Sequence, residues 1–140
     1  MPDILVDAGP LIALISRGDR FHEVCARRFR VLDCPFVTTL PVVAEAMHFL
    51  QYYGGKAGQE ALWKLILRED LILEHPTNTD LIRMDALMKK YADCPMDFAD
   101  ASLVSVAERL GIDRIFTLDL SDFIVYRLCG RKPFRLVELQ

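Results

Sequence analysis

The segment Ile4-Leu5-Val6-Asp7-Ala8-Gly9-Pro10 places a carboxylate between a short apolar run and a turn. The apolar, partly β-branched residues predict a strand over residues 4–6, and the Gly-Pro pair predicts that a helix begins soon afterwards. Asp7 then lies at the carboxyl end of the strand, which is where open α/β sheets bind their ligands. Acids in similar settings further along the chain are therefore its candidate partners.

Short apolar runs alternate with helical patterns along the rest of the chain. Further strands are predicted at residues 36–38, 71–73, 115–117 and 134–139. Helices are predicted at about residues 10–15, 21–32, 40–53, 59–68 and 96–110, and another runs to about residue 91 after a cap at Thr77 or Thr79. We expect Thr39 to cap the third of these helices with its hydroxyl. This alternation predicts an α/β fold with a parallel sheet covered on both faces, and the lack of a linker or repeat predicts one domain over residues 1–140.

Length and composition restrict the class of protein. The 140 residues are a usual size for one domain, and 52% of them are hydrophobic. No apolar stretch approaches the ~18 residues needed to span a membrane, and the start Met1-Pro2-Asp3 lacks the basic residues of a signal peptide. The widely spaced cysteines predict reduced thiols in a cytoplasmic protein, and the scattered histidines argue against a zinc site.

The charge is unevenly distributed. The net charge of −3 argues against a general nucleic-acid binder. Basic residues nevertheless cluster in two segments, residues 17–30 and residues 127–135. Either these residues are solvated surface, or they follow a phosphate backbone on both sides of an acidic centre.

Acidic residues occupy several positions that a parallel sheet would bring to one edge. Asp119 follows the fourth predicted strand, and Glu45 lies about one turn into the helix after the second strand. Asp97 and Asp100 lie in the first turns of the helix that precedes the fourth strand. Converging carboxylates raise one another's pKa, and a bound divalent cation relieves that repulsion. Oxygen ligands without His or Cys favour Mg²⁺ or Mn²⁺ over zinc, and such a site suits phosphodiester hydrolysis.

Taken one at a time, most of these acids also have an ordinary structural interpretation. Asp97 and Asp100 suit the dipole of a helix start, and Asp119 with Ser121-Asp122 suits a turn. Glu45 is harder to explain in this way, because its neighbours are apolar and glutamate is seldom buried without a partner. The functional interpretation therefore depends on the joint pattern.

Four segments resemble the motifs of PIN-domain ribonucleases and occur in the same order. They are ILVDAGPLIAL at residues 4–14, Glu45, MDFADASL at residues 96–103, and FTLDLSDF at residues 116–123. The resemblance covers essentially the whole chain. Its size and lack of appended segments are similar to those of VapC-type toxins of bacterial and archaeal toxin–antitoxin pairs.

The resemblance implies a three-layer α/β/α sandwich with a mainly parallel five-stranded sheet. It also implies a Mg²⁺- or Mn²⁺-dependent endoribonuclease that cuts RNA, forms a homodimer, and is neutralised by an antitoxin whose C-terminal segment wraps the toxin. Carried over by motif, the catalytic acids are Asp7, Glu45, Asp100 and Asp119. Among these, Asp7, Asp100 and Asp119 are the implied metal ligands.

The third and fourth motifs each contain a second acid. Asp100 is preferred to Asp97 as the site acid, and Asp119 is preferred to Asp122. Asp97 and Asp122 remain additional candidates. Thr117 is another, because its hydroxyl can orient a carboxylate or water, although strand propensity also explains it.

One departure from the family pattern concerns the residues after Asp7. The family often has Ser, Thr or Asn there, whereas Ala8-Gly9-Pro10 supplies no polar side chain. A supporting contact to Asp7 is therefore expected to be missing. This supports one alternative function, a catalytically silent PIN-like module that binds RNA or protein. A housekeeping RNA-processing nuclease is a second alternative. A phospho-acceptor signalling domain is a third, but its acidic pair and late lysine are not evident.

Overall fold

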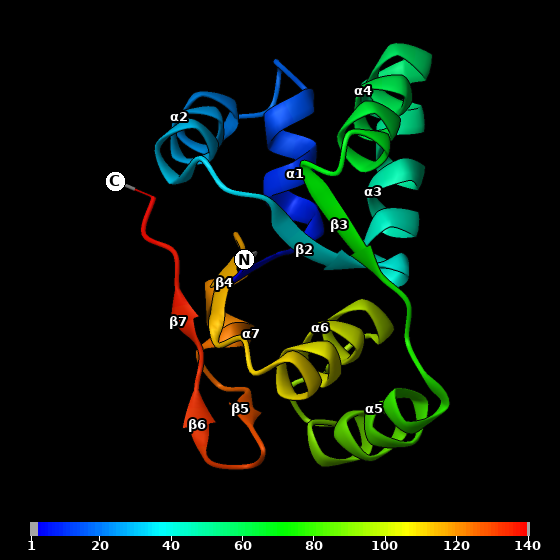
Figure 1. The fold of residues 1–140 in the computed structure, drawn as a ribbon, viewed down its shortest axis with the longest axis vertical. Helices are drawn as coiled ribbons and strands as arrows, with labels where there is room; N and C mark the ends of the chain where they lie inside the picture. Colours follow the sequence, from blue (N-terminus) through cyan, green and yellow to red (C-terminus); the bar gives the residue numbers. More distant parts are fainter. Residues whose placement is uncertain (1–2, 140) are drawn as a thin grey trace.

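The computed structural model describes residues 3–139 (Figure 1). The strands of its main sheet are β1 (Ile4–Val6), β2 (Phe36–Thr39), β3 (Leu71–Glu74), β4 (Arg114–Phe116) and β7 (Arg135–Leu136). The helices are α1 (Ala8–Ile15), α2 (His22–Leu32), α3 (Leu40–Tyr53), α4 (Gly55–Leu67), α5 (Asn78–Lys90), α6 (Phe98–Leu110) and α7 (Leu120–Phe123). Residues 1, 2 and 140, at the ends of the predicted domain, lie outside the described residues.

The main sheet has the strand order β3-β2-β1-β4-β7, and all four neighbouring pairs are parallel. In the centre, Leu5 pairs with Val37 on one side and Ile115 on the other. Val6 pairs with Phe116, so the next residues, Asp7 and Thr117, leave the sheet at the same edge. The register of β1 and β4 therefore assembles the edge at which the acids were expected.

Helices cover both faces of this sheet. Figure 1 shows α1 to α4 on one side of the sheet and α5 and α6 on the other. The chain moves from β1 through β2 to β3 in one direction, and it then returns to β4 on the other side of β1. Right-handed crossovers in opposite directions place their helices on opposite faces. The predicted three-layer α/β/α fold is confirmed.

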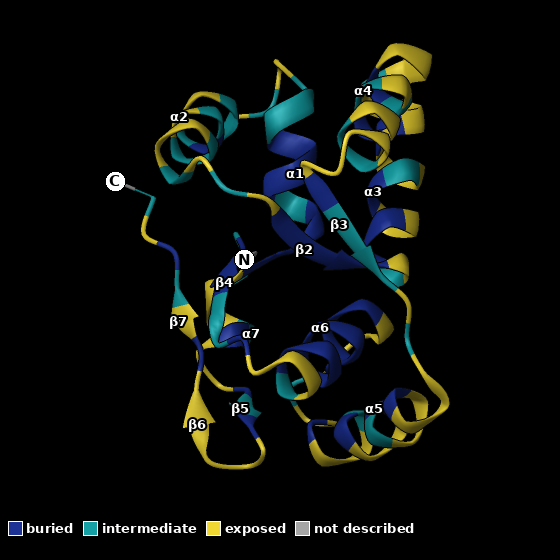
Figure 2. Cartoon of the chain, in the orientation of Figure 1, coloured by how far each residue is buried: buried dark blue, intermediate teal, exposed yellow. Residues whose placement is uncertain are grey.

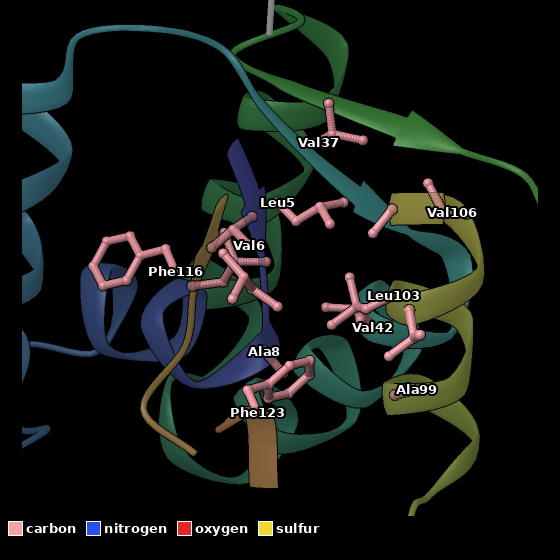
Figure 3. Close-up of a cluster of buried hydrophobic side chains, with 14 of the residues drawn as sticks. Leu5, Val6, Ala8, Val37, Val42, Ala99, Leu103, Val106, Phe116 and Phe123 are labelled. Atoms are coloured by element: carbon pink, nitrogen blue, oxygen red, sulfur yellow. The ribbon is translucent and has the colours of Figure 1, made fainter. Parts of the chain in front are cut away.

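The core is concentrated around the central strands and α6 (Figure 2). Every residue of β1 is buried, and α6 is buried continuously from Ala99 to Ala107. A helix that is buried all round lies between two packed layers, and α6 contacts both β2 and α5. Figure 3 shows Leu103 of α6 in one apolar cluster with Leu5 and Val42. The sheet edge and the start of α6 are therefore held by the same core.

Several boundaries differ from the prediction. The fourth helix starts at Gly55 rather than residue 59, because the chain turns at Gly55 with a positive φ and becomes helical again at once. The strand predicted over residues 134–139 shortens to Arg135–Leu136. Before it, β5 (Arg127–Leu128) and β6 (Lys132–Pro133) form an antiparallel ribbon whose turn has positive φ at Cys129 and Gly130.

Thr39 does not cap α3 with its side chain, as was predicted. Its hydroxyl instead lies 2.6 Å from the hydroxyl of Ser102 on α6. Both residues are fully buried, so this hydrogen bond satisfies two polar groups between α6 and the end of β2. The tertiary hydrogen bond to Ser102 thus takes the place of the predicted cap of α3. Within residues 3–139, none of the helices combines the length and apolar character needed to cross a membrane.

Candidate functional site

Asp7 connects the end of β1 to the start of α1. Its backbone N–H donates to the Phe116 carbonyl at 2.9 Å, which continues the pairing with β4. Its Oδ1 accepts from the Ala8 N–H at 2.8 Å and so caps α1. The side chain is only 8% exposed, and burial raises the pKa of this carboxyl above its usual range.

Thr117 bridges Asp7 and Asp119. Its buried hydroxyl donates to Oδ2 of Asp7 at 2.9 Å and accepts from the Asp119 backbone N–H at 2.9 Å. The expectation that Asp7 lacks a supporting polar contact is therefore wrong. The support comes from the adjacent strand β4, because its register places Thr117 beside Asp7. The candidate role of Thr117 in orienting a carboxylate agrees with this contact.

The two acids of the third motif have different structural positions. Asp97 is the N-cap of α6, and its Oδ1 accepts from the Asp100 N–H at 2.8 Å. Asp100 lies in the first turn of the helix and is 6% exposed. Burial, followed by the negative charge of Asp97, raises the pKa of Asp100 to about 7. The geometry thus assigns capping to Asp97 and places Asp100 within the acidic centre.

Tyr126 contacts this centre and was not predicted from the sequence. Its fully buried hydroxyl donates to Oδ2 of Asp100 at 2.9 Å. The ring packs edge-on against Tyr91 and Phe123, which hold it in place. The residue lies just after α7, in a stretch without a recognisable motif, so the only signal was its type.

Asp119 and Asp122 complete the acidic centre. Asp119 is the last residue before α7, and Asp122 lies within α7. One carboxylate oxygen from each of Asp100, Asp119 and Asp122 lies within 4.8 Å of the others. Partial burial and a hydrogen bond with Asp119 raise the pKa of Asp122. Both acids of the fourth motif therefore contribute to the cluster, including the one given second preference.

Glu45 lies on α3 beside an open pocket of about 420 Å³. The pocket is also lined by Asp7, Ala8, Gly9, Ile12, Phe49, Leu118 and Asp119. Glu45 is exposed, although its apolar neighbours in sequence suggested a buried residue. Partial burial and the negative charge of Asp7 still raise the pKa of Glu45. The side chain therefore faces the other acids from the solvent side.

Basic residues of the C-terminal cluster have partners away from the acidic pocket. Arg135 and Lys132 pair with Asp113, and Arg127 donates to the carbonyls of Ile124, Val125 and Tyr126. None of the arginines or lysines lines the acidic pocket in the part of the chain that the structure describes. The interpretation as ordinary surface therefore fits the C-terminal cluster.

The donor set of the site consists of carboxylate oxygens. Asp100, Asp119 and Asp122 share one cluster, and Asp7 joins Asp119 at the adjoining pocket. Burial is the largest cause of the raised pKa of Asp100, and the negative charges of Asp97, Asp7 and Asp119 raise it further. Such a set fits a hard divalent cation, because its charge offsets the repulsion and its preferred ligands are oxygens.

Comparisons with known proteins agree with this architecture. The chain is similar to the structure of the Mycobacterium tuberculosis VapC20 toxin, described as cleaving the sarcin–ricin loop, with a TM-score of 0.76 and 22% identity over 84% of this chain and 92% of that one. It is also similar to a chain of a Klebsiella pneumoniae toxin–antitoxin complex, with a TM-score of 0.68 and 18% identity over 98% of both chains. No curated protein matches at the level of sequence. The family model of the PIN domain matches residues 4–126, and the chain therefore belongs to the PIN domain family.

Proposed function

We propose that this protein is a divalent-metal-dependent endoribonuclease and the toxin of a type II toxin–antitoxin system. The observation that carries the proposal is the meeting of Asp7, Glu45, Asp100 and Asp119 at one sheet edge, beside an open pocket. Membership of the PIN domain family supports a nuclease. The two structural neighbours, a toxin that cleaves the sarcin–ricin loop and a toxin–antitoxin complex, support the toxin role.

The metal ligands in this proposal are Asp7, Asp100 and Asp119, with Mg²⁺ or Mn²⁺ as the ion. Asp122 is an additional ligand candidate, because its carboxylate shares the oxygen cluster with Asp100 and Asp119. When bound, the ion supplies Lewis acidity to the phosphodiester group and lowers the pKa of water. Asp7 and Asp100 must be ionised to bind the metal ion, and the pKa of each is raised in the metal-free protein.

The remaining residues position these acids and the water. Thr117 and Tyr126 donate hydrogen bonds to Asp7 and Asp100, and these bonds favour the ionised forms and restrict the carboxylate rotamers. Glu45 faces the pocket from the solvent side. We assign Glu45 two roles, which are to orient the attacking water and to accept a proton from that water. Asp97 contributes by capping α6 and thus placing Asp100.

The partners in this proposal are an RNA substrate, a cognate antitoxin, and a second copy of the chain in a homodimer. Localisation in the cytoplasm follows from an RNA substrate of the same cell. A growth assay tests the toxin role: expression of the chain should arrest growth, and co-expression of a short reading frame directly upstream should restore it. A housekeeping nuclease would give no arrest.

Cleavage of RNA by the purified protein tests the enzymatic part. The wild type should cut RNA with Mn²⁺ or Mg²⁺ and stop when a chelator removes the ion. Asp7→Asn should lose the activity, whereas Asp85→Asn should retain it, because Asp85 is an exposed acid paired with Lys89 on α5. Equal cleavage by the wild type and Asp7→Asn would refute the assignment. RNA binding without any cleavage would indicate the silent module instead.

A further inference from the structure

Two aromatic side chains follow Glu45 along one face of α3. Glu45, Phe49 and Tyr53 are spaced four residues apart, so they form one row on the helix surface. The rings of Phe49 and Tyr53 stack, with centroids 4.4 Å apart and an interplanar angle of 23°. Phe49 is 41% exposed and Tyr53 is 68% exposed. We call this pair the aromatic platform.

The platform is continuous with the acidic pocket. Phe49 lines the pocket together with Glu45, Asp7 and Asp119, whereas Tyr53 lies one turn further from the carboxylates. Tyr53 stacks on the Phe49 ring, and Phe49 remains 41% exposed, so part of its ring surface is available for a second planar group. Ile12 and Leu118 supply further apolar surface in the same pocket. A planar, largely uncharged group fits these surroundings better than a charged one.

The negative charge of the pocket repels a polyanionic substrate such as RNA. Its described lining residues include three carboxylates and no cation. A bound ion can neutralise part of this charge, but phosphates on either side of the scissile one gain no basic partner within the pocket. Stacking of a base on an aromatic ring is an uncharged contact that does not depend on sequence. Such a contact offsets the repulsion without a basic residue.

We propose that the aromatic platform stacks an unpaired RNA base next to the phosphate that is cut. This inference rests on the proposed ribonuclease function and adds which residues of this chain, Phe49 and Tyr53, hold the base beside the scissile phosphate. Bases within a duplex are already stacked on both faces, so only an unpaired base can stack on the exposed part of the Phe49 ring. The separation of Glu45 and Phe49 by one helical turn, about 5 to 6 Å, suits neighbouring parts of one nucleotide.

The test uses short single-stranded oligoribonucleotides in which 2-aminopurine occupies each position in turn. Its fluorescence falls when it stacks on an aromatic ring, and Ca²⁺ replaces Mg²⁺ so that binding is measured before Mg²⁺ is added to start cleavage. Quenching should occur with the wild type and Phe49→Tyr, and it should be lost with Phe49→Leu, which keeps apolar volume without a ring. Tyr52→Leu is the matched control, because Tyr52 is an exposed aromatic residue of α3 that contacts His48 and does not line the pocket.

Steady-state cleavage of the same RNA gives the second measurement. Phe49→Leu should raise KM by about 5-fold to 100-fold with little change in kcat, because stacking binds substrate and transition state equally. Unchanged quenching and KM in Phe49→Leu would overturn the inference while leaving the nuclease proposal intact. Quenching by a wild type that cuts no RNA would refute the nuclease and retain the platform. A change in the oligomeric state of Phe49→Leu with normal RNA binding would mean that the platform is a protein interface.

Discussion

Replacement of Thr117 by valine should shift the pH dependence of RNA cleavage to higher pH. Valine has nearly the same shape, so the change removes the hydrogen bond to Asp7 with little change in packing. A hydrogen bond to a charged group contributes about 1.5 to 3 kcal/mol, and one pKa unit corresponds to about 1.36 kcal/mol. The pKa of Asp7 should therefore rise by about 1 to 2 units beyond the value already raised by burial.

The sign follows from the ionisation that metal binding requires. Asp7 binds a cation only when it is ionised, so cleavage activity should rise as the pH passes the pKa of Asp7. In Thr117→Val this rise in activity should occur at higher pH. The assay is the rate of RNA cleavage in Mn²⁺ across a pH series. Thr117→Ser should behave like the wild type, because it retains the hydroxyl.

Thr38→Val is the matched control for the loss of a buried hydroxyl. The Thr38 hydroxyl donates to the Val6 carbonyl at 2.8 Å and does not contact an acid. Both valine variants should lose stability to urea, in Thr117→Val partly because the Asp119 N–H loses its acceptor. Only Thr117→Val should shift the pH profile. Identical profiles for the two variants and the wild type would refute the role assigned to Thr117.

Two further predictions concern Asp100. Tyr126→Phe should raise the pKa of Asp100 above about 7 and weaken Mn²⁺ binding at neutral pH by about 10-fold to 100-fold, as measured by calorimetry. Tyr91→Phe is the control and should bind Mn²⁺ normally, because the Tyr91 hydroxyl accepts from the Arg127 backbone N–H. Because the pKa of Asp100 is raised in the folded state, the metal-free protein should lose stability as pH rises from about 4 to about 7. Asp100→Asn should show a smaller loss and be more stable than the wild type to urea in chelator at pH 8, by at most about 3 kcal/mol after solvent screening. A less stable Asp100→Asn under these conditions would contradict the unfavourable burial of this charge.

The fold was largely predictable because its signals are local. Apolar runs such as Ile4-Leu5-Val6 and turn residues such as Gly9-Pro10 report on the chain within a few positions. The alternation of strands and helices then restricts the topology to right-handed parallel crossovers. The prediction failed where local patterns were weak, as in residues 134–139, where only Arg135–Leu136 joins the main sheet.

The candidate site was predictable only in part. The positions of Asp7, Glu45 and Asp119 followed from strand ends and helix starts, which the sequence marks locally. The choice between Asp97 and Asp100 needed the orientation of the helix start, because one acid caps α6 and the other faces the cluster. Glu45 is exposed although its neighbours in sequence are apolar, because the exposure of a helical residue depends on how α3 packs.

The sequence by itself determined which residue types stand at the ends of the strands, because strand, turn and helix preferences act between near neighbours. Only the tertiary structure decided which side chains support the acids. Thr117 reaches Asp7 across 110 positions and Tyr126 reaches Asp100 across 26. These contacts follow from strand register and from the packing of α7 near the start of α6, and neither is encoded in local periodicity. The polar contact missing after Asp7 is therefore supplied by Thr117, the residue that follows β4.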